Sequence, residues 1–104
     1  LGLFRARTGR FQEAIPLLQA ADQEQPNNSG ILSNLGAAQR GAGDDEAAVA
    51  TLREAWRLDT ENIVALYNLC ELQSERLQFD EIIPILEEWL ERHPEDQRAR
   101  RLLI

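Results

Sequence analysis

The sequence predicts an all-α fold built from antiparallel helix pairs that repeat every 34 residues. Three observations lead to this prediction. First, residue types recur at that spacing, since Leu35 corresponds to Leu1, Leu69 and Leu103. Second, apolar residues follow the i, i+3, i+4, i+7 pattern of amphipathic helices between short polar breaks. Third, the composition is 43% hydrophobic with only six aromatic residues, which is typical of a helical packing unit.

The repeat has a recognisable motif around its Leu–Gly pair. Gly36 corresponds to Gly2 and Cys70, and Thr60 corresponds to Pro26 and Pro94. Further matches at the same spacing are Ala48 with Ala14 and Ile82, Leu52 with Leu18 and Leu86, Ala55 with Ala21 and Trp89, and Asn62 with Asn28 and Asp96. A Leu–Gly pair, a small-x-x-x-large pair and a closing proline at this period are the signature of a tetratricopeptide repeat. The whole chain therefore resembles a tetratricopeptide-repeat array.

This resemblance implies an α-α superhelix, or solenoid, with a concave groove. The register divides the chain into a partial repeat at 1–28, repeats at 29–62 and 63–96, and the start of a further repeat at 97–104. The predicted helices span residues 1–8, 11–25, 29–41, 45–58, 62–76, 79–92 and 97–104. Gly9 and Arg10 are expected to form a turn, which makes Pro16 a tolerated proline near the first turn of its helix. Pro84 is expected to play the same role two repeats later.

The predicted core lies between the helices of neighbouring pairs. Gly36 is expected where two helices cross closely, and Cys70 is expected to be a packed structural thiol. The other inward positions are Leu32, Leu35, Gln39, Ala48, Leu52, Ala55, Ile63, Leu66 and Leu69. Both chain ends carry apolar residues where a terminal repeat normally has a polar face. We therefore expect a fragment of a longer array, with end-to-end self-association through Leu3, Phe4, Leu102, Leu103 and Ile104.

Composition excludes several classes of function. The net charge of −7 argues against binding to a nucleic-acid backbone, which needs clustered cations. No apolar run reaches the roughly 20 residues that span a membrane, so membrane insertion is not expected. Cys70 is the only cysteine, which excludes an internal disulfide and a thiolate metal cage. All eleven cations are arginine, a hint of a GC-rich bacterial genome, and the compartment stays open.

No arrangement of residues predicts catalysis, a cofactor or a metal site. His93 is the only histidine and lies in an interhelix link, where a solvated or capping role is expected. No helix carries a His–His or Glu–His pair with metal-ligand spacing. The carboxylates Glu87, Glu88 and Glu91 are expected on a solvated outer face. Trp56 and Trp89 are expected to be packing residues.

The predicted functional surface is the concave groove formed by the first helix of each repeat. Its expected peptide-binding residues are Ser33, Asn34, Ala37, Arg40, Tyr67, Asn68, Glu71, Ser74, Arg98 and Arg101. Asn34 and Asn68 lie one repeat apart, in a slot where family members often use asparagine to hydrogen-bond a peptide backbone. An amide supplies both a donor and an acceptor. The alternative is that both amides make hydrogen bonds within the repeats, and the sequence leaves the two readings open.

One specialised role of the family does not fit this sequence. Chaperone-binding members clamp an acidic carboxy-terminal tail with Lys, Asn, Asn, Lys and Arg at set groove positions. With Asn68 as the middle asparagine, Ser33 and Ala37 occupy the preceding slots, and Arg98 and Leu102 the following ones. A clamp for a chaperone tail is therefore not expected.

The resemblance favours a protein-interaction scaffold that binds a peptide or a protein partner in its groove. Two alternatives stay open. The chain could be a non-catalytic, substrate-presenting region of a larger glycosyl-, sulfo- or methyltransferase. It could also be an assembly segment of a secretion, pilus or envelope complex. The flanking sequence would discriminate between them, and the segment itself is expected to be catalytically silent in all three.

Overall fold

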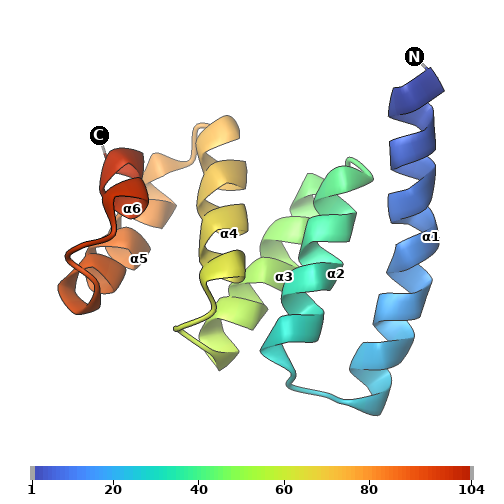
Figure 1. Ribbon diagram of the computed structural model, residues 1–104, viewed down its shortest axis with the longest axis horizontal. Coiled ribbons are helices and arrows are strands. Elements are labelled where there is room, and N and C mark those ends of the chain that lie inside the picture. Colours follow the sequence, from blue (N-terminus) through green and yellow to red (C-terminus); the bar gives the residue numbers. More distant parts are fainter. Residues whose placement is uncertain (1, 104) are drawn as a thin grey trace.

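The computed structural model describes the backbone of residues 2–103 and the side chains of residues 9–103. Within these residues the chain folds into helices joined by short links, without any strand (Figure 1). The helices are α1 (Gly2–Glu24), α2 (Ser29–Gly41), α3 (Asp45–Leu58), α4 (Ile63–Glu75), α5 (Phe79–Arg92) and α6 (Gln97–Leu102). The prediction of an all-α fold is confirmed.

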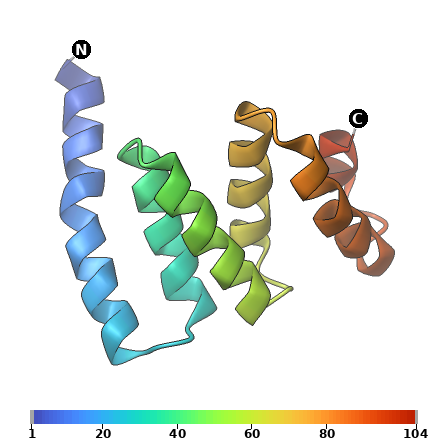
Figure 2. The same ribbon diagram turned by 180° about the vertical axis from the view of Figure 1, so that it is seen from behind.

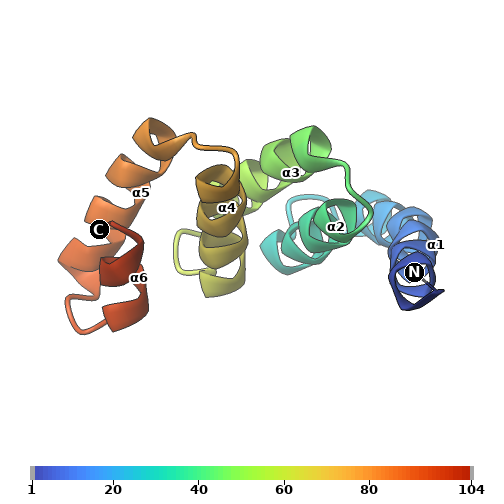
Figure 3. The same ribbon diagram turned by 90° about the horizontal axis from the view of Figure 1, so that it is seen from above.

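The helices form two rows that follow a curved array. Seen from above, α2, α4 and α6 lie along one side, and α3 and α5 lie along the other (Figure 3). In the view from behind, α3 lies in front of α2, and α5 lies in front of α6 (Figure 2). Contacts join α2 to α3, α3 to α4, α4 to α5 and α5 to α6, so each pair packs on the next. This is the predicted superhelical stacking.

The starts of α2, α4 and α6 are set by one repeated capping contact. Asn28, Asn62 and Asp96 stand 34 residues apart, and each side-chain oxygen accepts a hydrogen bond of 3.1 Å from the backbone N–H three residues later. This contact satisfies an amide that would otherwise lack a partner in the first turn. The Asn62 amide also donates to Ser29 Oγ at 2.7 Å, so the cap ties one repeat to the preceding one.

The core lies where the sequence pattern placed it. Leu35, Ala48, Leu52, Leu66 and Leu69 are all buried. A Cβ built on Gly36 would lie 2.6 Å from Leu52 Cγ, so the helices α2 and α3 approach too closely for any side chain at this position. Cys70, in the equivalent slot of α4, is fully buried. The predictions of a close crossing at Gly36 and a packed thiol at Cys70 are confirmed.

The structure corrects the prediction for the first repeat, because α1 runs unbroken through Gly9 and Arg10. In the equivalent turn of the second repeat, Gly43 has φ +90° and Asp44 caps α3 by accepting from the Ala47 amide. Arg10 stands in the place of Asp44 and carries no acceptor, so a new helix at Phe11 would start without a side-chain cap. A single glycine inside a helix costs only about 1 kcal/mol relative to alanine, and the helix continues.

The continuous helix changes the position of Pro16. The residue lies deep inside α1 and not near its first turn, although the helix is not broken there. Proline has no backbone N–H, so the carbonyl of Gln12 loses its usual helical partner. Pro84 is the sixth residue of α5 and is likewise accommodated within the helix.

Two further expectations about packing are corrected. Ile63 was expected to point inward, but it is 44% exposed at the first position of α4. Leu102 and Leu103 were expected to be unpaired, yet both are half-buried against the core cluster that contains Trp89 and Ala99. The side chains of Leu3 and Phe4, and all of Ile104, lie outside the described residues.

No helix in the described part of the chain has the length and apolar character needed to cross a membrane.

Candidate peptide-binding groove

The side of the array formed by α2, α4 and α6 presents most of the residues predicted to bind a peptide. On α2, Asn34 is exposed, whereas Ala37 and Arg40 are half-buried. On α4, the half-buried residues are Tyr67, Asn68, Glu71 and Ser74. Arg98 and Arg101, on α6, are exposed.

Ser33 is a correction to this set. Its side chain is only 3% exposed, and its hydroxyl donates to the carbonyl of Gly30 at 3.0 Å. Adjacent residues point in different directions on a helix, so Asn34 faces the surface while Ser33 faces the packed side of α2. Its hydroxyl is therefore not available to a ligand.

Arg40 bridges the space between α2 and α4. Its guanidinium donates to Glu75 Oε1 at 2.6 Å, to Asn68 Oδ1 at 3.3 Å and to Glu71 Oε2 at 3.5 Å. The Asn68 amide donates in turn to the carbonyl of Val64 at 3.0 Å. Asn68 therefore makes hydrogen bonds within the array, while its amide keeps one further N–H and one acceptor site for a ligand.

Tyr67 and Trp89 converge on one carboxylate at the base of the groove. Tyr67 Oη donates to Asp96 Oδ2 at 2.5 Å, and Trp89 Nε1 donates to the same oxygen at 2.9 Å. Burial, followed by the Asp96 hydrogen bond, raises the pKa of Tyr67 to about 12. Burial alone would raise the pKa of Asp96, but the hydrogen bonds from Tyr67, Trp89 and the α6 amides lower it. The phenol thus keeps its proton and the carboxylate its charge.

Arg98, on α6, lines the groove and contacts two residues of α4. Its guanidinium carbon lies 4.2 Å from the centroid of the Tyr67 ring, within the range of a cation–π contact. The same side chain forms an ion pair with Glu71. Arg98 therefore connects the two helices through one aromatic contact and one charged contact.

Two neighbouring cavities lie along this groove. One has a volume of about 430 Å³ and is lined by Ile63, Val64, Tyr67, Asn68, Glu71 and Arg98. The other has a volume of about 540 Å³ and is lined by Glu61, Ile63, Tyr67, Trp89, His93, Glu95 and Asp96. Ile63 and Tyr67 line both, so the two cavities are adjacent parts of one groove between α4 and α6.

Several lining residues were missed or assigned otherwise from the sequence. Val64 was not singled out, yet it is 47% exposed one helical turn before Asn68. Its spacing from Asn68 could have placed it on the groove face, because residues i and i+4 share one side of a helix. Trp89 is a packing residue, as expected, and it also lines the groove.

His93 caps the end of α5 and joins two interhelix links. Its backbone N–H donates to the carbonyl of Trp89, and its ring lies 4.0 Å from the Trp89 ring between centroids. His93 Nε2 is 2.8 Å from Glu61 Oε2, and Arg92 contacts the other oxygen of Glu61. The capping role is the one expected from the sequence. Among the residues that the structure describes, no cluster of three His, Cys, Asp or Glu side chains could hold a metal ion.

Comparison with known families decides what this helical array is. The family model described as "Tetratricopeptide repeat" matches residues 6–57 and 39–104, which together cover nearly the whole chain. The chain belongs to the tetratricopeptide-repeat family. The resemblance read from the 34-residue period is thereby confirmed.

Solved structures of MamA are similar to this tetratricopeptide-repeat chain. MamA 41-end from Desulfovibrio magneticus RS-1 has a TM-score of 0.77 at 25% identity, and a MamA RS-1 double mutant has a TM-score of 0.78 at 26% identity. Each comparison covers 98% of this chain and 61% of the MamA chain. Among curated proteins, none matches the sequence. The repeat fold and these neighbours indicate a protein-interaction scaffold.

Proposed function

We propose that the tetratricopeptide-repeat chain binds an extended peptide segment of a partner protein in the groove between α4 and α6. The observation that carries this proposal is the pair of adjacent cavities, of about 430 and 540 Å³, that share Ile63 and Tyr67. Ligand sites in proteins are usually concave, with an apolar lining and a few well-placed polar groups. This groove has both features.

The apolar part of the site is formed by Ile63 and Val64. Their side chains are 44% and 47% exposed, side by side at the start of α4. Covering them with an apolar side chain of the peptide removes that area from water, which is favourable by about 25 cal/mol per Å². An aliphatic or aromatic residue of the partner is therefore expected at this point of the groove.

The charged residues of the groove are largely paired with one another. Arg40 contacts Glu71 and Glu75, and Arg98 contacts Glu71. A peptide with many like charges would have to compete with these pairs. The groove is thus suited to a segment of mixed or low charge, with its affinity coming from apolar contact and backbone hydrogen bonds.

In this proposal Asn68 supplies a backbone hydrogen bond within the groove, and Asn34, on α2, supplies a second one where the peptide extends from the groove over the preceding repeat. Asn34 is exposed, and Asn68 has one amide N–H beyond the one that donates to Val64. A neutral hydrogen bond contributes roughly 0.5–1.5 kcal/mol, so two of them change affinity by about tenfold or more. Tyr67, Arg40 and Glu71 would set selectivity through the shape and the charge at the edges of the groove.

The test begins with selection of peptides from a random library on the immobilised chain, followed by calorimetry with the selected peptides. The Ile63→Ser, Val64→Ser variant and the Asn34→Ala, Asn68→Ala variant should each bind about tenfold more weakly or worse. Leu17→Ser is the matched control, because Leu17 is 74% exposed on α1, away from the groove. Unchanged affinity in both groove variants would place the peptide elsewhere and return the asparagines to a role within the repeats.

A further inference from the structure

The two cavities of the groove between α4 and α6 differ in the charges that line them. The cavity of about 430 Å³ contains Glu71 and Arg98, which form an ion pair with each other. The cavity of about 540 Å³ contains the carboxylates of Glu61, Glu95 and Asp96, and none of its described lining residues is an arginine or a lysine. The larger cavity therefore carries an excess of negative charge that the smaller one lacks.

The chain itself balances the charge of this larger cavity only in part. Arg92 donates to Glu61 Oε1 at 2.8 Å, so the charge of this carboxylate has a cationic partner. Asp96 instead accepts hydrogen bonds from Tyr67 and Trp89, whose donor groups carry no charge. The hydrogen bonds hold the Asp96 carboxylate in place, while its negative charge remains in the cavity.

Glu95 adds a second carboxylate whose charge is not balanced by an arginine. Its side chain is 76% exposed, and its Oε1 lies 3.7 Å from His93 Nδ1, which is too far for a hydrogen bond. The other ring nitrogen of His93 already lies 2.8 Å from Glu61 Oε2. Glu95 and Asp96 are consecutive residues in the link that leads to α6, so their two charges lie together on the lining of one cavity.

The same cavity has an apolar wall beside these carboxylates. Ile63 is 44% exposed there, and the rings of Trp89 and His93 lie against each other with 4.0 Å between their centroids. Lysine and arginine side chains combine a methylene stem, which packs on apolar surface, with a charged end that stays among polar groups. The larger cavity offers a counterpart to both parts of such a side chain.

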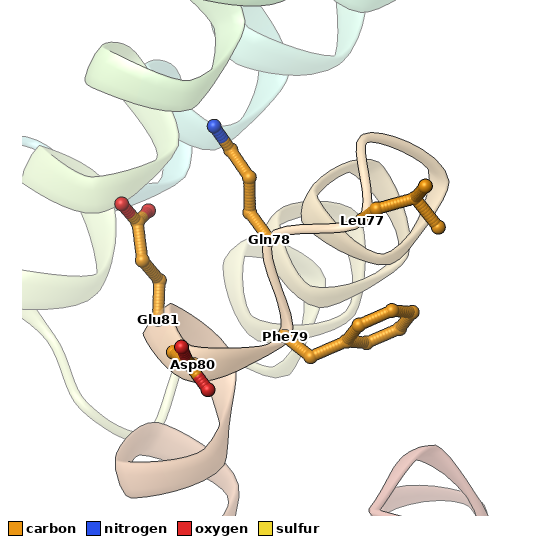
Figure 4. A pocket seen from close by; sticks show the side chains of 5 residues that line it. All are labelled: Leu77, Gln78, Phe79, Asp80 and Glu81. Carbon is orange, nitrogen blue, oxygen red and sulfur yellow. The ribbon is translucent and has the colours of Figure 1, made fainter.

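A third cavity shows that acidic residues alone do not give this arrangement. It has a volume of about 330 Å³ and is lined by residues 77–81, at the turn between α4 and α5. Figure 4 shows Leu77 and Phe79 extending to one side of this turn, while Glu81 extends to the other. Glu81 also forms an ion pair with Arg53. The apolar and acidic side chains of this turn therefore do not face a common space, and one of the charges is already paired.

We propose that the larger cavity binds the side chain of a lysine or arginine in the partner peptide, an inference that rests on the proposed function of the groove. The methylene stem packs on Ile63, and the charged end lies between Glu95 and Asp96. A cation at this point meets complementary charge, which favours basic over neutral and acidic side chains. The ligand class is thus a segment with a basic residue at a fixed position.

The position of that residue follows from the shared wall of the two cavities. Ile63 and Tyr67 line both, so two peptide side chains that fill them are neighbours on one side of the peptide. In an extended chain, side chains on the same side belong to residues two positions apart, separated by roughly 6.5 Å. The partner segment should therefore carry an apolar residue for the smaller cavity and a basic residue two positions away for the larger one.

Peptides selected from a random library on the immobilised chain give the first result. The selected sequences should be enriched in a lysine or arginine two positions from an apolar residue. Replacing that basic residue by norleucine keeps the stem and removes the charge, and calorimetry should then show binding that is weaker by about tenfold. Replacement by glutamate should weaken binding further, because it places like charges together.

A change of charge in the protein gives the sharper result. Glu95→Arg should weaken binding of the basic peptide by about threefold or more and strengthen binding of its glutamate version. Glu95 is largely exposed, so the variant should fold like the unmodified chain. Glu87→Arg is the matched control, because it makes the same change in net charge at an exposed residue that lines neither cavity. It should leave the affinity of both peptides unchanged.

The outcomes separate this inference from the proposed function. Peptides that lose affinity with the Ile63→Ser, Val64→Ser variant occupy the groove. If such peptides show no enriched basic residue, or if norleucine and Glu95→Arg leave their affinity unchanged, the basic-residue site is wrong while the groove function stands. If the library yields no peptide that depends on Ile63 and Val64, both proposals are overturned.

Discussion

Leu52 fills the space that any side chain at Gly36 would need. A Cβ on Gly36 would lie 2.6 Å from Leu52 Cγ and 2.7 Å from Leu52 Cδ2, and both residues are buried. This contact sets the distance between α2 and α3. The spacing within the second repeat therefore depends on one residue without a side chain and one with a large, branched one.

Gly36→Val should destabilise the chain by at least about 1–3 kcal/mol, because an overpacked core forces side chains and backbone to shift. Cys70→Ala, in the equivalent slot of α4, should cost less, since it removes a single buried sulfur atom and introduces no overlap. Urea denaturation of the two variants measures the difference. If Gly36→Val unfolds at the same midpoint as the unmodified chain, the close crossing has been placed incorrectly.

Leu77→Gly should stabilise the chain by about 1 kcal/mol, because a left-handed backbone costs a residue with a Cβ roughly that much. Leu77 has φ 58° and is 76% exposed, so little packing is lost with its side chain. The matched reverse change is Gly43→Leu at φ +90°, where no atom lies within 4 Å of a built Cβ. Thermal unfolding should move in opposite directions for the two variants, and a shift of the same sign in both would contradict the backbone explanation.

Asp96 should make stability depend on acidic pH. Its pKa is lowered in the folded chain, so its contribution is fully present above its unfolded pKa of about 3.9 and is lost as pH falls through the lower folded value. Asp96→Asn keeps an oxygen acceptor but has no charge to titrate. The stability advantage of the unmodified chain over this variant should thus shrink below about pH 4. Melting temperatures between neutral and acidic pH measure this difference, and a constant difference would exclude the linkage.

Cys70 should be unreactive while the chain is folded. The side chain is fully buried, and burial raises the pKa of its thiol to about 12, so the reactive thiolate is scarce at neutral and mildly alkaline pH. Labelling by iodoacetamide should proceed only as fast as the array opens, and it should become rapid in urea. Fast labelling of the folded chain at pH 8 would show that the slot opens locally.

Much of the architecture follows from the sequence alone, because residues with the same structural role, such as helix caps, recur at the same position of each repeat. The capping slots of Asn28, Asn62 and Asp96 recur 34 residues apart, and each makes the same hydrogen bond. The small residue at Gly36 and the large one at Leu52 are likewise local signals of a close helix crossing. Local signals of this kind predicted the positions of α2 to α5, the core residues and the family.

The tertiary structure alone decided where the repeat departs from its own pattern. Gly9 looks like a turn by register, yet α1 continues through it, and Arg10 offers no side-chain acceptor that would favour the start of a new helix. The orientation of Ser33 depends on how α2 is rotated about its own axis against its neighbours, and spacing along the sequence does not resolve that rotation.

The detailed contacts of the candidate groove could not be predicted from the sequence either. Tyr67, Trp89 and Asp96 are brought together from three different helices or links, through hydrogen bonds of 2.5 and 2.9 Å. Arg40 reaches residues 28 to 35 positions away. Repeat spacing determines which residues share a helix face, but contacts between faces depend on how neighbouring helices pack, and that is set only when the whole array is folded.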